Sequence, residues 1–392
     1  MVLYNLHMYK FAIIGVGGIG KTHLKAILND RRCTVSALCS RTISKCYDLK
    51  KEFSLPDDIT VTDDWKSLLK RDDIDAAAIA LPPALHREVT IAFLENGKHV
   101  ILEKPMALTL EEEDEMLEAQ RKSGKKLGLI FQNRYYTSVQ KAKKMLDDGT
   151  FGKILSIDVT SHWFRGVNYH NLYWRGTWES EGGGTLTAQG IHQVDMLLWL
   201  MGGQAENISA VMRNMRHTNS EAEDMGFAFI SFPSALASFS VSLNDMNEYQ
   251  GFRIQCEKAS ITLPEWSVHV AKPQPNGYPE RDEAEEKRFQ DIYDSIPTLE
   301  KEGHDEAFSR FIDALEEGKE PEVDGLDGRR ATEFVDAFYL SAATGKTVSF
   351  PLGKDSPVYT KEGLVKTMPK YFSKTVSTEA QSGSISLGSA AK

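Results

Sequence analysis

Short apolar runs and segments of helical periodicity alternate along the first third of the chain. An apolar run over residues 11–14 leads into a glycine-rich turn, after which Leu24, Ile27 and Leu28 recur at helical spacing. The alternation continues through "TVSALCS", "DAAAIALPP", "REVTIAFLENG" and "KHVILEKP". Strand and helix in this order predict βαβ units and a parallel sheet.

A different pattern follows, in which β-rich segments are separated by turn residues. They are "ILSIDVTSHW", "NISAVMRNM", "FAFISF", "LASFSVSLN" and "FRIQCEKASITL". Apolar and polar residues alternate in "LASFSVSL", which predicts a sheet with one buried and one polar face. These segments predict an antiparallel sheet, with an insertion or a loop excursion at residues 264–303, where Pro, Gly and charged residues cluster.

One segment combines glycines with helical periodicity around a histidine. The stretch "GGGTLTAQGIHQVDMLLWLMG", residues 182–202, places Ile191, Val194, Leu198 and Met201 at three- and four-residue spacing. This spacing predicts an amphipathic helix. His192 lies beside the apolar stripe, so it is either a satisfied core residue or a residue with a chemical role.

Length, charge and cysteine content narrow the class of protein. The 392 residues allow two or three domains, and the net charge of −10 argues against a nucleic acid or an anionic membrane as partner. The four cysteines form no CxxC pair, so we expect no disulfide framework, no metal and a cytoplasmic location. The first residues lack the apolar region of a signal peptide, and no apolar run is long enough for a membrane span. Residues 373–392, rich in Ser, Gly, Ala and Thr, are expected to be a disordered tail.

The first glycine-rich turn has the spacing of a dinucleotide-binding loop. Gly15 permits a tight turn, Gly17 allows the backbone to approach a pyrophosphate, and Gly20 allows close packing of helix and strand. The helix that follows presents free N–H groups to the phosphates, so Gly18 and Ile19 join the predicted site. Strand and helix flank the motif correctly, and we therefore predict an NAD(P)(H) site.

The end of the second predicted strand indicates which dinucleotide is bound. A carboxylate at this place binds the ribose 2′-hydroxyl of NAD(H), but the chain has Ser40 followed by Arg41. Arginine and serine suit a 2′-phosphate, so we expect a preference for NADP(H). Alternatively, Arg41 is solvated or stacks on the adenine of either cofactor.

Further candidates follow the next two predicted strands. Leu81, Pro82 and His86 come after "AIA", and Glu103 and Lys104 end "KHVILEK". Ligands of open α/β sheets bind beyond the carboxyl ends of the strands, so all five residues are expected at the cofactor crevice. The alternative for Lys104 is an ordinary surface lysine.

Four segments together resemble the Gfo/Idh/MocA family of oxidoreductases. They are "GVGGIGKTH", "LPPALHREVTIAFLENGKHVILEKPMA", "YWRGTWESEGGG" and "GIHQVDMLLWLMG", in the order and spacing of that family. The resemblance implies an α/β fold with an N-terminal Rossmann domain, residues 8–128, and a C-terminal α/β domain, residues 129–372. It also implies that the second domain contains a large, open, mostly antiparallel sheet, through which such proteins form homo-oligomers.

The resemblance also implies a reaction. Such enzymes pass a hydride between a carbon bearing a hydroxyl and the nicotinamide, so a base must take the hydroxyl proton. His192 matches the family's catalytic histidine and Lys104 the lysine of its EKP motif, whose charge stabilises the developing alkoxide. Trp174 and Arg175 are expected to approach the nicotinamide end of the cofactor.

One position departs from the family pattern. The residue four before the histidine is usually Asp and sometimes Asn, but here it is Ala188. This departure puts in doubt the family's trio of aspartate, histidine and lysine, and with it a contact to a substrate hydroxyl. Gln189 could supply an uncharged polar contact, and Asp195 could orient the imidazole of His192. Asp195 could equally be a capping or surface carboxylate.

Aromatic and arginine residues complete the predicted substrate set. Sugars bind through aromatic faces and polar groups that fix their hydroxyls. Besides Lys104, Gln189, His192 and Asp195, the candidates are Arg134, Tyr135, Trp163, Arg165 and Trp178. For any single tryptophan, core packing is an equally good interpretation. His304 is a further candidate pocket residue.

The sequence therefore predicts an oxidoreductase that interconverts a secondary hydroxyl and a ketone on a sugar, glycoside or cyclitol. Oxidation of a glycoside at C3 is one form of this reaction. Two alternatives remain open: a redox-assisted glycoside cleavage, and a dinucleotide-binding regulator without turnover. Neither a nucleic acid nor a membrane is expected as a partner.

Overall fold

The computed structural model describes residues 8–379, which form two compact units. The first contains the chain up to Gln132 together with Lys301–Arg329, and the second contains Asn133–Glu300 and the residues from Arg330 onward. Residues 301–329 thus belong to the first unit, although the sequence analysis placed them in the second domain.

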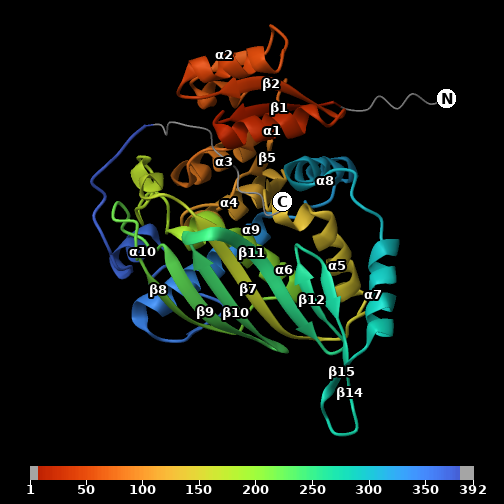
Figure 1. Cartoon of the computed structure of the whole chain (residues 1–392). Helices are drawn as coiled ribbons and strands as arrows, with labels where there is room; N and C mark the ends of the chain where they lie inside the picture. Colours follow the sequence, from red (N-terminus) through yellow and green to blue (C-terminus); the bar gives the residue numbers. More distant parts are fainter. Residues whose placement is uncertain (1–7, 380–392) are drawn as a thin grey trace, which may run out of the picture. The chain divides into compact units, whose positions relative to one another are not determined.

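The first unit is built on a six-stranded parallel sheet in the order β3-β2-β1-β4-β5-β6 (Figure 1). This is the strand order of a Rossmann fold. The strands are β1 (Tyr9–Ile14), β2 (Cys33–Cys39), β3 (Thr60–Thr62), β4 (Ala76–Ile79), β5 (His99–Leu102) and β6 (Leu127–Leu129). The helices are α1 (Gly18–Leu28), α2 (Ile43–Glu52), α3 (His86–Glu95), α4 (Leu110–Ser123) and α8 (Gly303–Glu317).

The central strands are apolar on both faces, as a parallel sheet covered by helices requires. All four residues of β4 are fully buried. The turn after β1 needs glycine: Gly15 has a φ of +96°, and a Cβ there would overlap the carbonyl oxygen of Ala80. A Cβ at Gly20 would overlap the carbonyl oxygen of Gly15, which confirms the close packing of helix and strand inferred from the spacing.

Helix α8 joins the first unit because its aromatic side chains pack there. The ring of Phe308 lies 6.1 Å from that of Phe11 and 5.1 Å from that of His23. Gly128 accommodates Phe311, whose ring would be 2.7 Å from a Cβ at position 128. These contacts link residues far apart in the sequence, which local pattern cannot reveal.

The second unit contains an eight-stranded mixed sheet in the order β13-β12-β11-β7-β10-β9-β8-β16 (Figure 1). Only β7 and β10 pair in parallel, and the other pairs are antiparallel, as expected. The strands are β7 (Ile154–Phe164), β8 (Asn207–Arg213), β9 (Met225–Phe232), β10 (Ala235–Ser242), β11 (Asn244–Cys256), β12 (Ser260–Leu263), β13 (Ser267–His269) and β16 (Val348–Ser349). The helices are α5 (Thr137–Asp147), α6 (Ile191–Met201), α7 (Glu283–Ser295), α9 (Gly325–Thr344), which starts in the first unit, and α10 (Lys361–Thr367).

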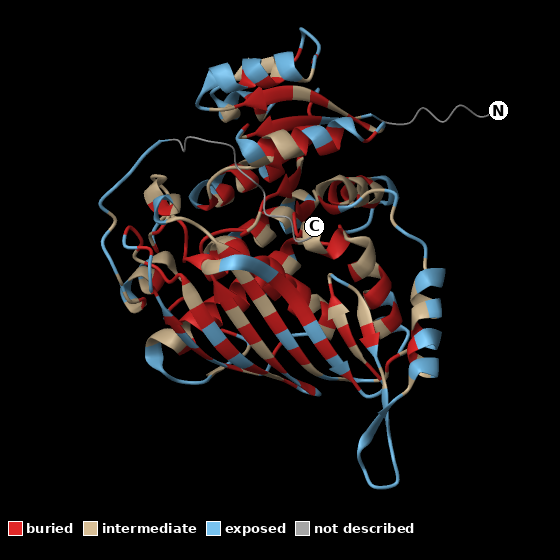
Figure 2. Ribbon diagram, viewed as in Figure 1, coloured by how far each residue is buried: buried red, intermediate tan, exposed pale blue. Residues whose placement is uncertain are grey.

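Buried and exposed residues alternate along the strands of this sheet (Figure 2). The alternation confirms the two-faced sheet predicted from "LASFSVSL". The outer face is not wholly polar, however, because Phe229 is 76% exposed and Leu236 is 66% exposed.

Of the two expectations for residues 264–303, the loop excursion is wrong, since much of the segment is regular. It contains β13, α7 and a two-stranded hairpin of β14 (Ala271–Pro273) and β15 (Pro279–Arg281) that projects beyond the large sheet (Figure 1). The ring of Phe289 on α7 packs 5.0 Å from that of Phe151, and Tyr293 stacks on Trp266 at 4.1 Å. The charged face of α7 and the exposed hairpin contain the clustered Pro, Gly and charged residues from which the loop was predicted.

The predicted tail, residues 373–392, lies partly outside the described residues. Within the described part, the backbone N–H groups of Thr375 and Val376 donate to the side-chain oxygen of Asn219, and that of Thr378 donates to the carbonyl of Asn171. Residues 375–378 are thus held against the second unit. Among residues 8–379, no helix combines the length and apolarity that a membrane crossing needs.

Candidate active site

The candidate cofactor residues of the first unit follow the carboxyl ends of neighbouring parallel strands. The last residues of β1, β2, β4 and β5 are in register, so the residues after them share one edge of the sheet. Gly15 follows β1, Ser40 and Arg41 follow β2, Leu81 and Pro82 lie just beyond β4, and Glu103 and Lys104 follow β5. Helix α1 begins at Gly18 at the same edge, with Ile19 and Gly20 in its first turn.

This edge fits a dinucleotide. No atom lies within 4 Å of a Cβ built at Gly17, so a phosphate can approach the backbone there. The first turn of α1 carries no acidic side chain that would repel the pyrophosphate from the helix N-terminus. Ser40 and Arg41 place no carboxylate where β2 ends, and Arg41 is exposed.

His86 lies beneath this edge rather than on it. Its side chain is fully buried, with Nδ1 2.8 Å from the carbonyl oxygen of Pro105 and Nε2 2.8 Å from that of Leu81. The burial lowers the pKa of His86. Because no surface of the imidazole is exposed, the direct cofactor contact predicted for His86 is corrected: the side chain connects the two loops that follow β4 and β5.

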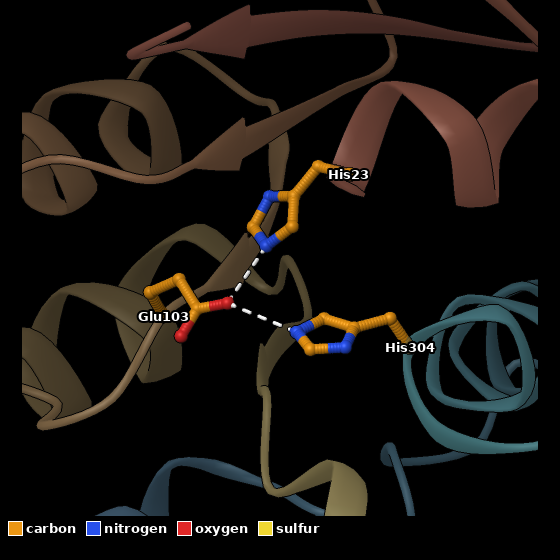
Figure 3. Close-up of side chains that lie close together, drawn as sticks. All are labelled: His23, Glu103 and His304. Atoms are coloured by element: carbon orange, nitrogen blue, oxygen red, sulfur yellow. Dashed lines mark hydrogen bonds and ion pairs between the residues drawn. The ribbon is translucent and has the colours of Figure 1, made fainter. Parts of the chain in front are cut away.

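Glu103 is also largely buried and forms a cluster that sequence reasoning missed (Figure 3). Its Oε1 lies 2.9 Å from Nε2 of His23, on α1, and 3.5 Å from Nε2 of His304, on α8. The three ligand atoms lie within 4.8 Å of one another, a spacing that could hold a metal ion. His23 stands in the quoted segment "GVGGIGKTH", but only the fold brings it to Glu103.

The predicted catalytic base, His192, lies on helix α6 of the second unit. A π-helical turn, Leu186–Gly190, runs directly into α6, and His192 is the second residue of that helix. His192 is 9% exposed and Gln189 is 8% exposed. The helix forms where it was predicted, but it is not amphipathic: its first seven residues are all buried, and Leu198 and Met201 of the predicted apolar stripe are only half-buried. Gln189 and His192 lie one turn apart at the start of this segment.

The glycines before this helix leave room for the buried carboxylate of Glu223 and the hydroxyl of Tyr339. Glu223 accepts hydrogen bonds from the backbone N–H groups of Gly184 (3.1 Å) and Leu186 (2.9 Å) and from the hydroxyl of Tyr339 (3.0 Å). A Cβ at Gly184 would overlap the carbonyl oxygen of Glu223, and one at Gly183 would overlap the hydroxyl of Tyr339. Burial raises the pKa of Glu223 to about 8. The network fixes the start of the helical segment that carries His192.

Gln189 is positioned by a residue that the sequence analysis did not select. Its amide Nε2 donates to the hydroxyl of Tyr169 at 2.7 Å. The guanidinium of Arg175 lies 4.2 Å from the ring centroid of Tyr169 and 4.1 Å from that of Trp174, and its Nη1 bonds to Glu181 at 2.6 Å. Tyr169 thus joins two predicted groups, the cofactor pair at 174–175 and the substrate residue Gln189.

Asp195 forms an ion pair that the sequence analysis did not predict. Its carboxylate forms a bidentate pair with the guanidinium of Arg134, with Nε 2.8 Å from Oδ2, and both side chains are almost fully buried. The guanidinium also lies 5.4 Å from the ring centroid of Trp199. The two residues form a structural ion pair beside α6, and the orientation of His192 by Asp195 stays a prediction.

The remaining candidates divide by exposure. Trp178 is fully buried, donates its indole N–H to the carbonyl of Pro369 and packs against Tyr339, so it belongs to the core and not to the substrate set. Tyr135, 2% exposed, is also a core residue. Arg165 is partly exposed, and its guanidinium lies 5.4 Å from the ring of the largely buried Trp163. Lys104 lies in the first unit and His192 in the second.

Comparison with known proteins adds relatives across nearly the whole chain. An uncharacterized oxidoreductase of Bacillus subtilis, YrbE, is 26% identical over 351 residues, which cover 86% of this chain and 95% of the relative. A D-glucoside 3-dehydrogenase of Escherichia coli is 29% identical over 194 residues, or 49% of this chain and 54% of that protein. The crystal structure of the WlbA dehydrogenase from Bordetella pertussis, in complex with NADH and UDP-GlcNAcA, superposes with a TM-score of 0.74 at 27% identity, covering 88% of this chain and 99% of that one.

Both structural units also match a single family. Residues 9–131 match the NAD-binding Rossmann fold of an oxidoreductase family, and residues 143–350 match the C-terminal alpha/beta domain of the same family. With the six-stranded parallel sheet, the glycine turn and the mixed second sheet, these matches show that the chain belongs to the Gfo/Idh/MocA family of oxidoreductases.

Proposed function

We propose that this chain is an NAD(P)-dependent dehydrogenase that interconverts a secondary ring hydroxyl and a ketone on a sugar, glycoside or cyclitol. The observation that carries the proposal is the position of Lys104, directly after β5 and at the same sheet edge as the glycine turn that fits a dinucleotide. His192, on α6 of the second unit, supplies the second functional group.

The two residues have complementary roles. His192 takes the proton of the substrate hydroxyl as the ketone forms, and returns it in the reverse reaction. The ammonium of Lys104 stabilises negative charge on the same oxygen. The nicotinamide, when bound, accepts or supplies the hydride. The residues of the glycine turn, together with Ser40 and Arg41, hold the dinucleotide, and Trp174 and Arg175 contact its nicotinamide end.

The polar residues at the start of α6 favour a neutral, hydroxyl-bearing substrate. With Ala188 in place of the family aspartate, the polar group beside His192 is the uncharged amide of Gln189, fixed by Tyr169. An amide can accept from or donate to a sugar hydroxyl without adding a carboxylate beside His192. The relative named D-glucoside 3-dehydrogenase supports a glycoside oxidised at C3 as the first candidate substrate.

Two features support finer proposals about the cofactor and the assembly. Ser40 and Arg41 after β2 favour NADP(H) over NAD(H), since an arginine can bind the 2′-phosphate and no carboxylate repels it. On the second unit, Phe229, Leu236 and Val211 expose apolar surface on the outer face of the sheet, which favours a homo-oligomer formed through this face. Sedimentation of Phe229→Glu beside the unaltered protein tests the assembly, and an unchanged molecular mass would contradict it.

A substrate panel tests the reaction. The protein is incubated with NAD⁺ or NADP⁺ and glucosides, cyclitols and anhydro-sugars, while the absorbance of the reduced nicotinamide and the release of aglycone are followed. Formation of the reduced cofactor with an intact glycoside is the expected result. Release of aglycone without net cofactor reduction would indicate redox-assisted cleavage instead. Dinucleotide binding without turnover on any member would favour a regulator.

A further inference from the structure

We propose that Glu103 is a positioning residue for Lys104, and that His23 and His304 hold its carboxylate in place (Figure 3). This inference rests on the proposed function in that it assumes a catalytic Lys104. It gives Glu103, which was expected at the cofactor crevice, and His304, which was expected in the pocket, a positioning role together with His23. The three residues come from the loop after β5, the start of α8 and helix α1.

The two oxygens of the carboxylate have separate partners. Oε1 faces both imidazoles, at 2.9 Å from Nε2 of His23 and 3.5 Å from Nε2 of His304. Oε2 accepts the backbone N–H of Lys104 at 3.3 Å. The side chain of Glu103 therefore couples the backbone of the candidate catalytic lysine to two helices, one of which begins at the dinucleotide-binding turn. A small displacement of a catalytic group is costly in rate, so such a coupling matters for hydride transfer.

The protonation states follow from burial. His23 is completely buried, and this burial lowers its pKa, so the ring is neutral. The hydrogen bonds from His23 and His304 outweigh burial and hold the pKa of Glu103 well below its usual value. A neutral imidazole carries one N–H, and the bond to Glu103 requires that this proton be on Nε2 of His23. Nδ1 of His23, which has no hydrogen-bond partner among residues 8–379, then carries no proton.

This tautomer argues against a metal ion at the cluster. An ion bound to Nε2 of His23 would force the proton onto Nδ1. That N–H would be buried without an acceptor, and buried N–H groups without a partner are rare. Metal-bound histidines almost always donate their second ring N–H to an acceptor. The described part of the chain offers none to Nδ1 of His23. The hydrogen-bonded network satisfies the donors of the cluster without an ion.

Helix α8, which carries His304, is held in place by an ion-pair network with Arg32. Asp30 is bonded to Arg32, with Nη2 2.8 Å from Oδ2. The Nη1 of Arg32 reaches two carboxylates of α8, Asp313 at 2.6 Å and Glu316 at 2.9 Å. Together with the packing of Phe308, these bonds fix the helix that starts at Gly303, and with it the imidazole of His304.

Two experiments test the proposal separately. The first needs no substrate. The ¹⁵N NMR signals of labelled histidine rings are recorded without and with added Zn²⁺, and the signal of His23 is identified by its loss in the His23→Gln variant. We expect a neutral ring protonated at Nε2, unaltered by Zn²⁺. A proton on Nδ1, or a shift of the His23 signal on addition of Zn²⁺, would overturn the proposal and indicate a metal site.

The second experiment compares His304→Ala, His304→Gln and Glu103→Gln with Glu317→Ala, an exposed control on the same helix. We expect Glu103→Gln and His304→Ala to lower kcat on the order of tenfold, with nearly unchanged dissociation constants for the dinucleotide. His304→Gln, which keeps an N–H donor, should recover most of kcat. Unchanged kcat in Glu103→Gln and His304→Ala would refute the positioning role, whereas no turnover by the unaltered protein would count against the proposed function and leave the first experiment intact.

Discussion

The guanidinium of Arg134 and the carboxylate of Asp195 form a bidentate pair in the interior of the second unit. Asp195 lies one helical turn after His192, so the pair fixes the helix that carries the candidate base. Arg134→Met would leave a buried, uncompensated carboxylate and should lower the free energy of unfolding by about 3–5 kcal/mol. Urea denaturation measures the loss. The double variant Arg134→Met, Asp195→Leu removes both charges and should recover most of the stability; a double variant as unstable as the single one would contradict the charge argument.

A second prediction concerns the glycine run before α6. A Cβ at Gly184 would overlap the carbonyl oxygen of Glu223, so Gly184→Ala must displace the network that fixes the helix start. We expect a loss of about 1–3 kcal/mol, the range for overpacking of a buried site. The matched control is Gly203→Ala, where nothing lies within 4 Å of the added carbon. Equal denaturation midpoints for the two variants would show that the glycine is not required.

A third prediction follows from the side-chain hydrogen bonds that Arg32 donates to Asp30. They lower the pKa of Asp30 below its ordinary value of 3.8. A carboxyl group with a depressed pKa in the folded state stabilises the fold above its unfolded pKa and loses that contribution as the pH falls. Stability should therefore decrease below about pH 4. In Asp30→Asn this part of the acid-induced decrease should be absent. A variant whose stability falls with pH as steeply as that of the unaltered protein would exclude Asp30 as its source.

A fourth prediction concerns cofactor choice. If Arg41 binds the 2′-phosphate of NADP(H), Arg41→Ala removes a charge-assisted contact that NADH cannot make. The variant should therefore bind NADPH about tenfold or more weakly, whereas its affinity for NADH should stay nearly unchanged. Dissociation constants measured by nicotinamide fluorescence give both values. Tighter binding of NADH than of NADPH by the unaltered protein would contradict the proposed preference.

Local pattern revealed the fold class because the elements that define it are local. The last four residues of β1 and all of β4 are apolar and buried, and the turn at Gly15 needs a glycine for its own φ and its close contact with Ala80. The family and both sheets were predicted on such segments and are confirmed. The helix α7 was missed because its exposed face is highly charged and only Phe289 and Glu286 are buried.

The parts of the site that sequence could not supply are pairings between distant residues. Nothing near His23 indicates Glu103 as its partner, and nothing near Glu223 indicates Tyr339. Likewise, nothing near Asp195 in the sequence indicates that Arg134, from another segment, binds its carboxylate. Burial, which decides whether a tryptophan such as Trp178 faces a ligand or the core, also depends on the whole fold.

The most direct test of the account is His192→Ala, because the account requires this imidazole for proton transfer and not for holding the dinucleotide. The variant is compared with the unaltered protein for NADPH affinity, and for reduction of the cofactor by whichever glycoside or cyclitol the panel identifies. We predict an unchanged dissociation constant and a loss of turnover of about a hundredfold or more. Turnover within a few fold of that of the unaltered protein would contradict the assignment of His192 as the base.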